Sequence, residues 1–446
     1  MSKEIDMTQG SITRQLVRFF LPVAAGTWFQ QLYNAVDAVI VGRYVGTEAL
    51  AAVGGSASTL INLLIGVFVS LTGGAAVVIS QYWGANREKE TADAVGTAIT
   101  FSLIIGIALS LICAPSARAL LILLKAPADT LDGATSYLRI CFSCAGFVLL
   151  LNTESSILRA VGDSRRPFLY MLISCLANIV LDLVFVIRFR LGVPGVAYAT
   201  VLSQILNFLL LTVDLSRRKG AYRLDLKKLR IVRGAFSRMM HIGVPAGLQS
   251  AMYSVSNTVL QSAVNTLGTI VVASWSLTGK LDGFYWATSN AAGIAVVTFI
   301  GQNYGAGRLD RVDECMKKSL KLFLVVTVSL SALIVGIAPS ALRLFSNDPE
   351  VVSTTYTITL YFVPFYFIWT FIEIISGVLR GCSDVTASTI ITGLGICLFR
   401  VLWVFTAFRI RHTLFVVSIS YLLSWLITAT ALIIYYRKGT WRTNPR

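Results

Sequence analysis

Long apolar runs separated by short polar segments fill the chain from residue 18 onwards. Each run reaches the roughly 20 residues that an α-helix needs to cross the hydrocarbon core of a bilayer. The runs that we assign as spans are 18–42, 49–80, 93–113, 135–158, 166–188, 194–215, 240–263, 270–300, 318–338, 355–379, 386–408 and 413–436. The pattern therefore predicts an all-α membrane protein with twelve transmembrane helices.

The beginning of the chain, MSKEIDMTQGS, is polar, and the first apolar run is longer than the hydrophobic region of a signal peptide. We therefore expect no cleavable signal. The second and eighth runs exceed the usual span length, and we expect them to tilt or to project beyond the bilayer.

Composition and charge agree with this class of protein. The chain is 55% hydrophobic and only 13% charged, whereas soluble domains are about a quarter charged. A net charge of +16 would suit nucleic acid, but Lys and Arg favour the loops on one side of the spans by about three to one. This positive-inside bias predicts cytoplasmic termini, and it makes the lipid bilayer the expected partner rather than nucleic acid.

The chain repeats itself. SQYWGANR (80–87) recurs as GQNYGAGR (301–308), and LRAVGDS (158–164) recurs at the same spacing as LRGCSDV (379–385). Because each repeat contains an even number of spans, both insert in the same orientation. We expect two six-helix lobes related by a pseudo-twofold axis along the membrane normal.

A basic segment between the repeats, RRKGAYRLDLKKLRIVRGAFSR, is expected to lie against anionic headgroups as a cytoplasmic linker. The predicted division is 1–215 for the N-lobe, 216–238 for the linker and 239–446 for the C-lobe.

Three polar groups stand deep within predicted spans. Asp37 lies in the first span, and Asn178 and Asp182 lie four residues apart in the fifth, on one helical face. An Asp at the centre of a span costs about 2.5 to 3.5 kcal/mol. If the two carboxyls face each other, we expect them to titrate as a coupled pair, with one proton retained near neutral pH. The three groups predict a proton or cation site.

The spaced pattern P…Q-x-x-Y-N-x-x-D-x-x-x-V-G-R-Y-x-G-x-x-A-L-A-A-V-G, together with the paired blocks, resembles the multidrug and toxic compound extrusion (MATE) family. The resemblance covers about residues 15–440. It implies a secondary antiporter of a prokaryotic plasma membrane that exports drug-like organic cations by alternating access, driven by protons or sodium ions. It assigns the coupling-ion site to Asp37, Asn178 and Asp182.

The same helix offers further candidates. Tyr33 is one turn before Asp37 and could donate a hydrogen bond to it, while Gln30 and Asn34 flank this face. Pro22 removes a backbone hydrogen bond and predicts a hinge at which the helix bends when the site is protonated.

The second half has a different set of polar residues. Glu373 is its one deep carboxylate in the tenth span, and we expect it either to pair with Arg400 or to bind a cationic substrate. Aromatic residues with π faces for cations include Trp275, Tyr285 and Trp286. The remaining ion or substrate candidates are Gln249, Tyr253, Asn257 and Gln261 at helical spacing, and Lys280 and Asp282, which point in different directions.

Other chemistry is not supported by the sequence. It contains neither HExxH nor a Walker-type loop, so we expect neither an enzyme nor an ATP-driven pump. The histidines are far apart, and Cys141 and Cys144 lie in an apolar run as packing residues. We expect no cofactor or metal other than a sodium ion in the coupling role, and a monomer suffices for two lobes around one cleft. The rival function is a flippase or exporter of lipid-linked or polysaccharide intermediates, which would need a basic cavity.

Overall fold

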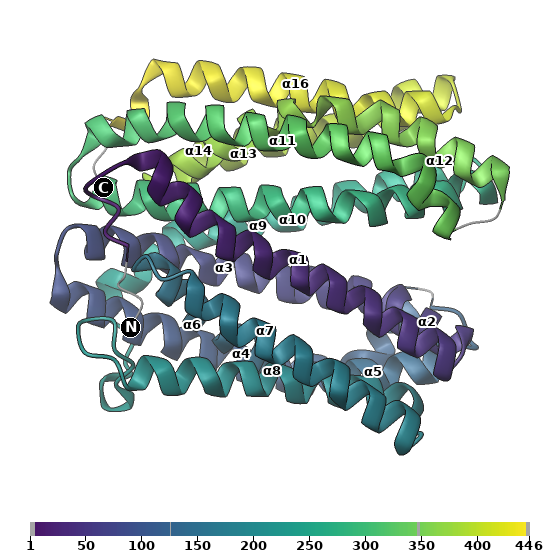
Figure 1. Ribbon diagram of the computed structural model, residues 1–446, viewed down its shortest axis with the longest axis horizontal. Coiled ribbons are helices and arrows are strands. Elements are labelled where there is room, and N and C mark those ends of the chain that lie inside the picture. Colours follow the sequence, from purple (N-terminus) through teal and green to yellow (C-terminus); the bar gives the residue numbers. More distant parts are fainter. Residues whose placement is uncertain (1–4, 125, 346–347, 443–446) are drawn as a thin grey trace. The chain divides into compact units, whose positions relative to one another are not determined.

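The computed structural model describes residues 5–124, 126–345 and 348–442, and these ranges form helices and loops without a strand. The helices of the first half are α1 (Ile12–Tyr44), α2 (Thr47–Ala52), α3 (Ser58–Gly84), α4 (Glu88–Leu123), α5 (Leu131–Ser143), α6 (Ala145–Ala160), α7 (Arg165–Asp182) and α8 (Gly192–Ser216). Those of the second half are α9 (Arg233–Asn265), α10 (Thr269–Gly305), α11 (Leu309–Phe345), α12 (Pro349–Phe362), α13 (Tyr366–Gly381), α14 (Val385–Thr392), α15 (Phe399–Trp403) and α16 (Leu414–Lys438). Figure 1 shows these helices along the chain.

Within these ranges, eight helical stretches are long and apolar enough to cross a membrane, and α5 with α6, bent by 51°, makes a ninth if it is one span. The long helices α1, α9 and α10 are not among them. They are the helices that carry most of the polar residues predicted to line a site, which lowers their mean hydropathy. The structure thus supports an all-helical membrane protein, and the number twelve stays a prediction.

Residue contacts divide the chain into two compact units. Unit 1 contains Met1–Asp6 and Leu21–Gly247, and unit 2 contains Met7–Phe20 and Leu248–Arg446. The first turns of α1 therefore belong to unit 2, and the first half of α9 belongs to unit 1. The division into lobes at 215 and 239 stays a prediction, because compactness and the repeat describe different properties of the chain.

In unit 1, α9 is held by the end of α3. Arg238 Nη1 donates to Tyr82 Oη at 3.2 Å, and the guanidinium lies 5.1 Å from the centre of the Tyr82 ring. Farther along, a Cβ on Gly243 would overlap the carbonyl oxygen of Leu71, and a Cβ on Gly74 would overlap that of Met239. The two backbones touch because both positions lack a side chain.

In unit 2, the start of the chain is held by the GQNYGAGR block and by α11. Asn303 Nδ2 and Arg311 Nη2 donate to the carbonyl of Met7 at 3.0 and 3.1 Å, and Arg311 Nη1 donates to that of Gly10 at 3.1 Å. Met7 is fully buried. The repeated Gln-containing blocks therefore have a structural role in each unit: each holds the beginning of a long helix.

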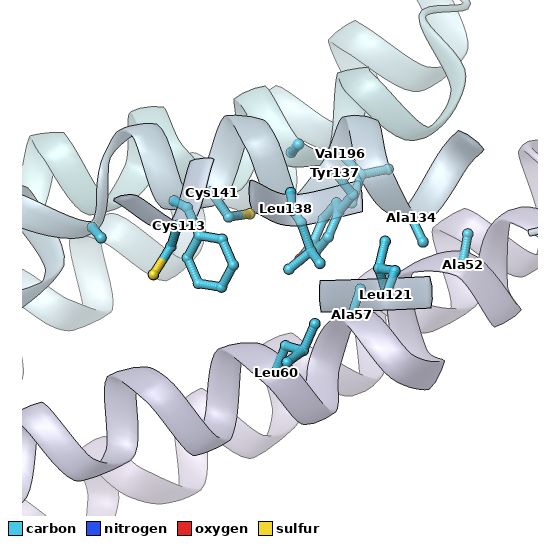
Figure 2. Close-up of a cluster of buried hydrophobic side chains, with 14 of the residues drawn as sticks. Ala52, Ala57, Leu60, Cys113, Leu121, Ala134, Tyr137, Leu138, Cys141 and Val196 are labelled. Carbon is cyan, nitrogen blue, oxygen red and sulfur yellow. The ribbon is translucent and has the colours of Figure 1, made fainter. Parts of the chain in front are cut away.

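The apolar core of unit 1 packs α5 against α4, α8 and the π-helical stretch Val53–Ala57 that precedes α3. Figure 2 shows part of this cluster, with the labelled side chains Ala52, Ala57, Leu60, Cys113, Leu121, Ala134, Tyr137, Leu138, Cys141 and Val196. Cys141 is buried here with a free thiol. Its predicted role as a packing residue is confirmed.

Candidate functional site

The predicted polar site lies within unit 1, at the ends of two helices. Asp37 stands about two turns before the end of α1, and Asn178 and Asp182 lie in the last two turns of α7. Asn178 and Asp182 are each 1% exposed. A π-helical stretch, Leu183–Arg188, begins directly after Asp182. Such stretches frequently occur at functional sites, because they turn side chains away from the regular helical position.

Several polar atoms of the site have no hydrogen-bond partner among the described residues. Buried atoms without a partner in the described part of the chain include Asp37 Oδ1, both side-chain polar atoms of Asn178 and both carboxyl oxygens of Asp182. The Asp37 and Asp182 carboxyls lie in direct reach of each other. Leaving a buried polar atom unpaired costs about 1–3 kcal/mol, and more for a charged group. The arrangement is one that a shared proton or a bound cation would satisfy.

Tyr33 lies beside this pair on α1, close enough for the Asp37 charge to act on it. The two described side chains form no hydrogen bond with each other, so the expected phenolic donation is absent here. Asn34 is exposed, whereas Gln30 and Tyr33 line the adjoining cavity.

A cavity of about 190 Å³ adjoins the site, between α1, α6, α7 and α8. Its walls include Asn178 and Tyr33 towards one end and Arg159 and Ser164 towards the loop that follows α6. Pro22 is also in the wall. The cavity therefore connects the level of the acidic pair with the end of α6.

Sequence reasoning missed several polar groups of unit 1. Arg159, Gln204 and Asn207 line the cavity, and Asn207 Oδ1 is buried without a partner among the described residues. Glu154 on α6 is 1% exposed; its Oε1 accepts a hydrogen bond from Thr212 Oγ1 at 2.6 Å, and Oε2 has none in the same ranges. The signal for Glu154 was the one that revealed Asp37, an acid within an apolar run.

A second cavity, of about 540 Å³, lies within unit 2. Its lining residues are Tyr253, Asn257, Gln261, Trp275, Thr278, Gly279, Asp282, Trp286, Phe362, Tyr366, Trp369, Arg400, Tyr421 and Trp425. The helical stripe on α9 is thus brought together with Asp282 on α10, as are two of the three aromatic residues selected from the sequence.

Three other candidates lie elsewhere. Gln249 is buried outside this lining, and Lys280 is exposed, with its ammonium 5.9 Å from the centre of the Phe345 ring. Glu373 packs against Gly293, where it fills the space of a missing side chain.

The alternative in which Glu373 pairs with Arg400 is wrong. Arg400 Nε donates to Ser424 Oγ at 3.0 Å, its guanidinium lies 3.9 Å from the centre of the Tyr421 ring, and the described part of the chain has no ion pair between it and Glu373.

Comparison with known proteins adds to this geometry. A family model, MatE, matches residues 22–184 and 245–406, once in each half. The probable multidrug resistance protein YoeA of Bacillus subtilis is 28% identical over 86% of this chain and 84% of its own length, and YpnP of the same organism is 27% identical over 99% and 98%. A crystal structure of MATE in complex with MaL6 superposes with a TM-score of 0.91 at 22% identity, over 100% of both chains. The fold and the doubled match agree with the internal repeat.

Proposed function

Because the chain belongs to the MatE family, a family of membrane transporters and not enzymes, we propose that it is a secondary antiporter that exports drug-like organic compounds in exchange for protons or sodium ions. Two of its relatives bear the name of probable multidrug resistance proteins. Organic cations are the expected substrates, because the first-half site is acidic.

The observation that carries this proposal is the pair of carboxyls on Asp37 and Asp182. They are within reach of each other, and three of their four oxygens are buried without a hydrogen-bond partner in the described ranges. A proton held by one carboxyl would bridge to the other. Alternatively, a sodium ion would be bound by these oxygens and the amide oxygen of Asn178, since hard cations prefer oxygen ligands.

Ion entry supplies the energy for export. A monovalent cation that moves down a potential of 100 mV releases about 2.3 kcal/mol, which supports a concentration ratio of some tens for a neutral solute. The cavity beside Asn178 and the Pro22 hinge support a coupling in which occupation of the site changes the bend of α1 and narrows the cavity.

The rest of the proposed architecture follows the sequence. We propose twelve spans in two six-helix lobes with a pseudo-twofold axis along the membrane normal, a multi-pass location in the plasma membrane, cytoplasmic termini and a monomeric transporter. Sodium as the coupling ion is the one bound metal that this proposal includes.

Export of lipid-linked intermediates is the second candidate. Arg159 in the first cavity is the one observation in its favour, because a pyrophosphate would need a basic partner. A single guanidinium does not make a basic cavity. The acidic pair would also have no role in the export of lipid-linked intermediates.

The test is uptake of ethidium into inside-out vesicles under a proton gradient and, separately, a sodium gradient. The parent is compared with Asp37→Asn and with the matched control Asp132→Asn, which removes an exposed acid paired with Arg118. We expect uptake in the parent and the control under one gradient, and little in Asp37→Asn. Full uptake by Asp37→Asn would exclude this site from coupling, and no uptake by the parent under either gradient would favour the second candidate.

A further inference from the structure

The cavity of unit 2 has an aromatic wall. Eight of its lining residues are aromatic, and several of their rings touch one another. Trp369 lies at the centre of the set, with ring centroids 5.1 Å from Trp286, 6.1 Å from Trp425 and 6.3 Å from Tyr253. Trp425 lies 5.9 Å from Tyr421. A continuous surface of rings favours a ligand with a flat aromatic body, which it can stack against or meet edge to face.

The same cavity contains a buried acidic side chain. Asp282 is 8% exposed, and its Oδ1 is buried without a hydrogen-bond partner in the described part of the chain. The hydroxyl of Tyr366 lies within reach of the Asp282 carboxyl. A buried carboxylate with an unpaired oxygen is stabilised by a cationic or hydrogen-bonding group placed against that oxygen.

The cavity also contains a buried positive charge. Arg400 is 3% exposed; its Nε donates to Ser424, and its face stacks on Tyr421. The two terminal nitrogens of the guanidinium make no hydrogen bond to any of the described residues. A planar guanidinium fixed in this way presents a fork of donors that matches a carboxylate.

Asp282 and Arg400 do not neutralise each other. No ion pair joins them within the described ranges, although both line the cavity and Tyr421 is close to both. An organic cation would pair with the carboxylate and leave the guanidinium unpaired. An organic anion would pair with the guanidinium and leave the carboxylate unpaired. A ligand that carries both charges satisfies both groups at once.

We propose that the cavity of unit 2 binds zwitterionic aromatic molecules, with the ammonium group at Asp282, the carboxylate at Arg400 and the ring system against the tryptophans. As a statement about exported substrates, this rests on the proposed function; as a statement about binding, it does not need transport. It adds a class of ligand that the acidic site of unit 1 would not select.

Energy transfer from the cavity tryptophans to a dansyl group measures this binding. Three probes of similar size differ in charge: Nε-dansyl-lysine is a zwitterion, its methyl ester is a cation, and 6-(dansylamino)hexanoic acid is an anion. The full chain in lipid nanodiscs is titrated with each probe without any ion gradient. We expect the zwitterion to bind about tenfold or more tightly than either of the others, because it gains one more charge-assisted contact.

Two variants separate the charged groups. Asp282→Asn is expected to weaken binding of the zwitterion and the ester about tenfold or more and not to weaken the acid. Arg400→Gln is expected to weaken the zwitterion and the acid and not the ester. The matched controls Glu350→Gln and Arg343→Gln remove exposed charges of the same unit and should leave all three affinities unchanged.

Equal affinities for the three probes in the parent overturn the proposal, and this comparison holds even if Arg400→Gln does not fold. Equal effects of the two variants on all probes also overturn it. Because binding needs no gradient, Asp37→Asn should bind the zwitterion as the parent does. Charge-selective binding by a parent that transports no ethidium would support this inference while the proposed function fails.

Discussion

Asp37 on α1 and Asp182 at the end of α7 meet inside one compact unit, and the described residues around them donate no hydrogen bond to Asp37 Oδ1 or to either oxygen of Asp182. Two ionised carboxylates in this arrangement repel each other in a low dielectric. The fold therefore holds the pair at a cost in stability, and it gains a site that responds to the arrival of a positive charge.

Removal of one of the two carboxyl charges should stabilise the protein that has no cation bound at this site. We expect Asp182→Asn to raise the unfolding free energy by about 1–3 kcal/mol at alkaline pH, where both carboxyls of the parent are ionised. The difference should shrink as the pH falls, because a proton then relieves the repulsion in the parent. Thermal unfolding in detergent at several pH values measures both effects. A difference that grows towards acid pH would contradict the geometry of the pair.

The loop after α6 offers a second pH dependence, outside the spans. Burial raises the pKa of the Asp163 carboxyl above its usual value, although Arg166, 2.8 Å away, opposes this. Because the folded state then holds the proton more tightly than the unfolded chain, the contribution of Asp163 to stability increases as the pH falls.

Arg166→Gln removes the cation beside Asp163 and should raise the pKa of the Asp163 carboxyl further. We expect a loss of about 1–3 kcal/mol near pH 7 that becomes smaller at a lower pH, as Asp163 takes up a proton. Unfolding midpoints at the two pH values test this. Arg118→Gln, which breaks an exposed pair with Asp132, should change the midpoint little at either pH.

Replacement by alanine should affect stability differently at two glycines of α9. A Cβ on Gly243 would overlap the backbone of Leu71, whereas a Cβ on Gly234 meets nothing within 4 Å. We expect Gly243→Ala to cost about 1–3 kcal/mol, since α3 and α9 must separate. Gly234→Ala should be neutral or stabilise by up to about 1 kcal/mol, because alanine favours a helix. The ratio of folded to aggregated protein after mild heating compares the two.

Arg311 should decide whether the start of the chain stays in place. Its side chain donates to Asn303 and to the carbonyls of Met7 and Gly10 while it is 8% exposed. Arg311→Gln should cost about 1–3 kcal/mol for each buried acceptor that it leaves unpaired, and it should expose residues 7–10. Hydrogen exchange of these amides would then be faster, and limited proteolysis near the N-terminus would increase. Arg308→Gln, in an exposed pair with Asp310, should leave both unchanged.

Much of the first-half site could be predicted because its residues are polar, whereas membrane spans are usually apolar throughout. Asp37, Asn178 and Asp182 stand out from apolar spans, and a spacing of four fixes a common face on one helix. Arg159, Gln204 and Asn207 were not selected, because their side chains reach the cavity only through the packing of α6 and α8 against α7.

In the second half, sequence patterns identified candidate residues but did not predict all of their contacts. Tyr253, Asn257 and Asp282 were each predicted as candidates, without the cavity that they share, and one predicted partner of Arg400 was wrong. A long side chain has several directions to choose from, and its contact with Tyr421 depends on how α15 packs against α16. The bend of 51° between α5 and α6 was likewise not predicted, because the sequence there has the pattern of one apolar run.

The attachment of Met7 to Gln302 and Arg311 has a consequence for biosynthesis. The backbone amide of Met7 and its partner on Gln302 are 295 residues apart. At about 5–20 residues per second, a ribosome needs roughly 15–60 s to make that stretch. Throughout this time the segment that begins at Met7 is without its native partners, while residues 21–247 can already assemble around one another. This segment, residues 7–20, is therefore the last part of the first half to settle, and it is open to the translocation machinery and to proteases until most of the protein exists.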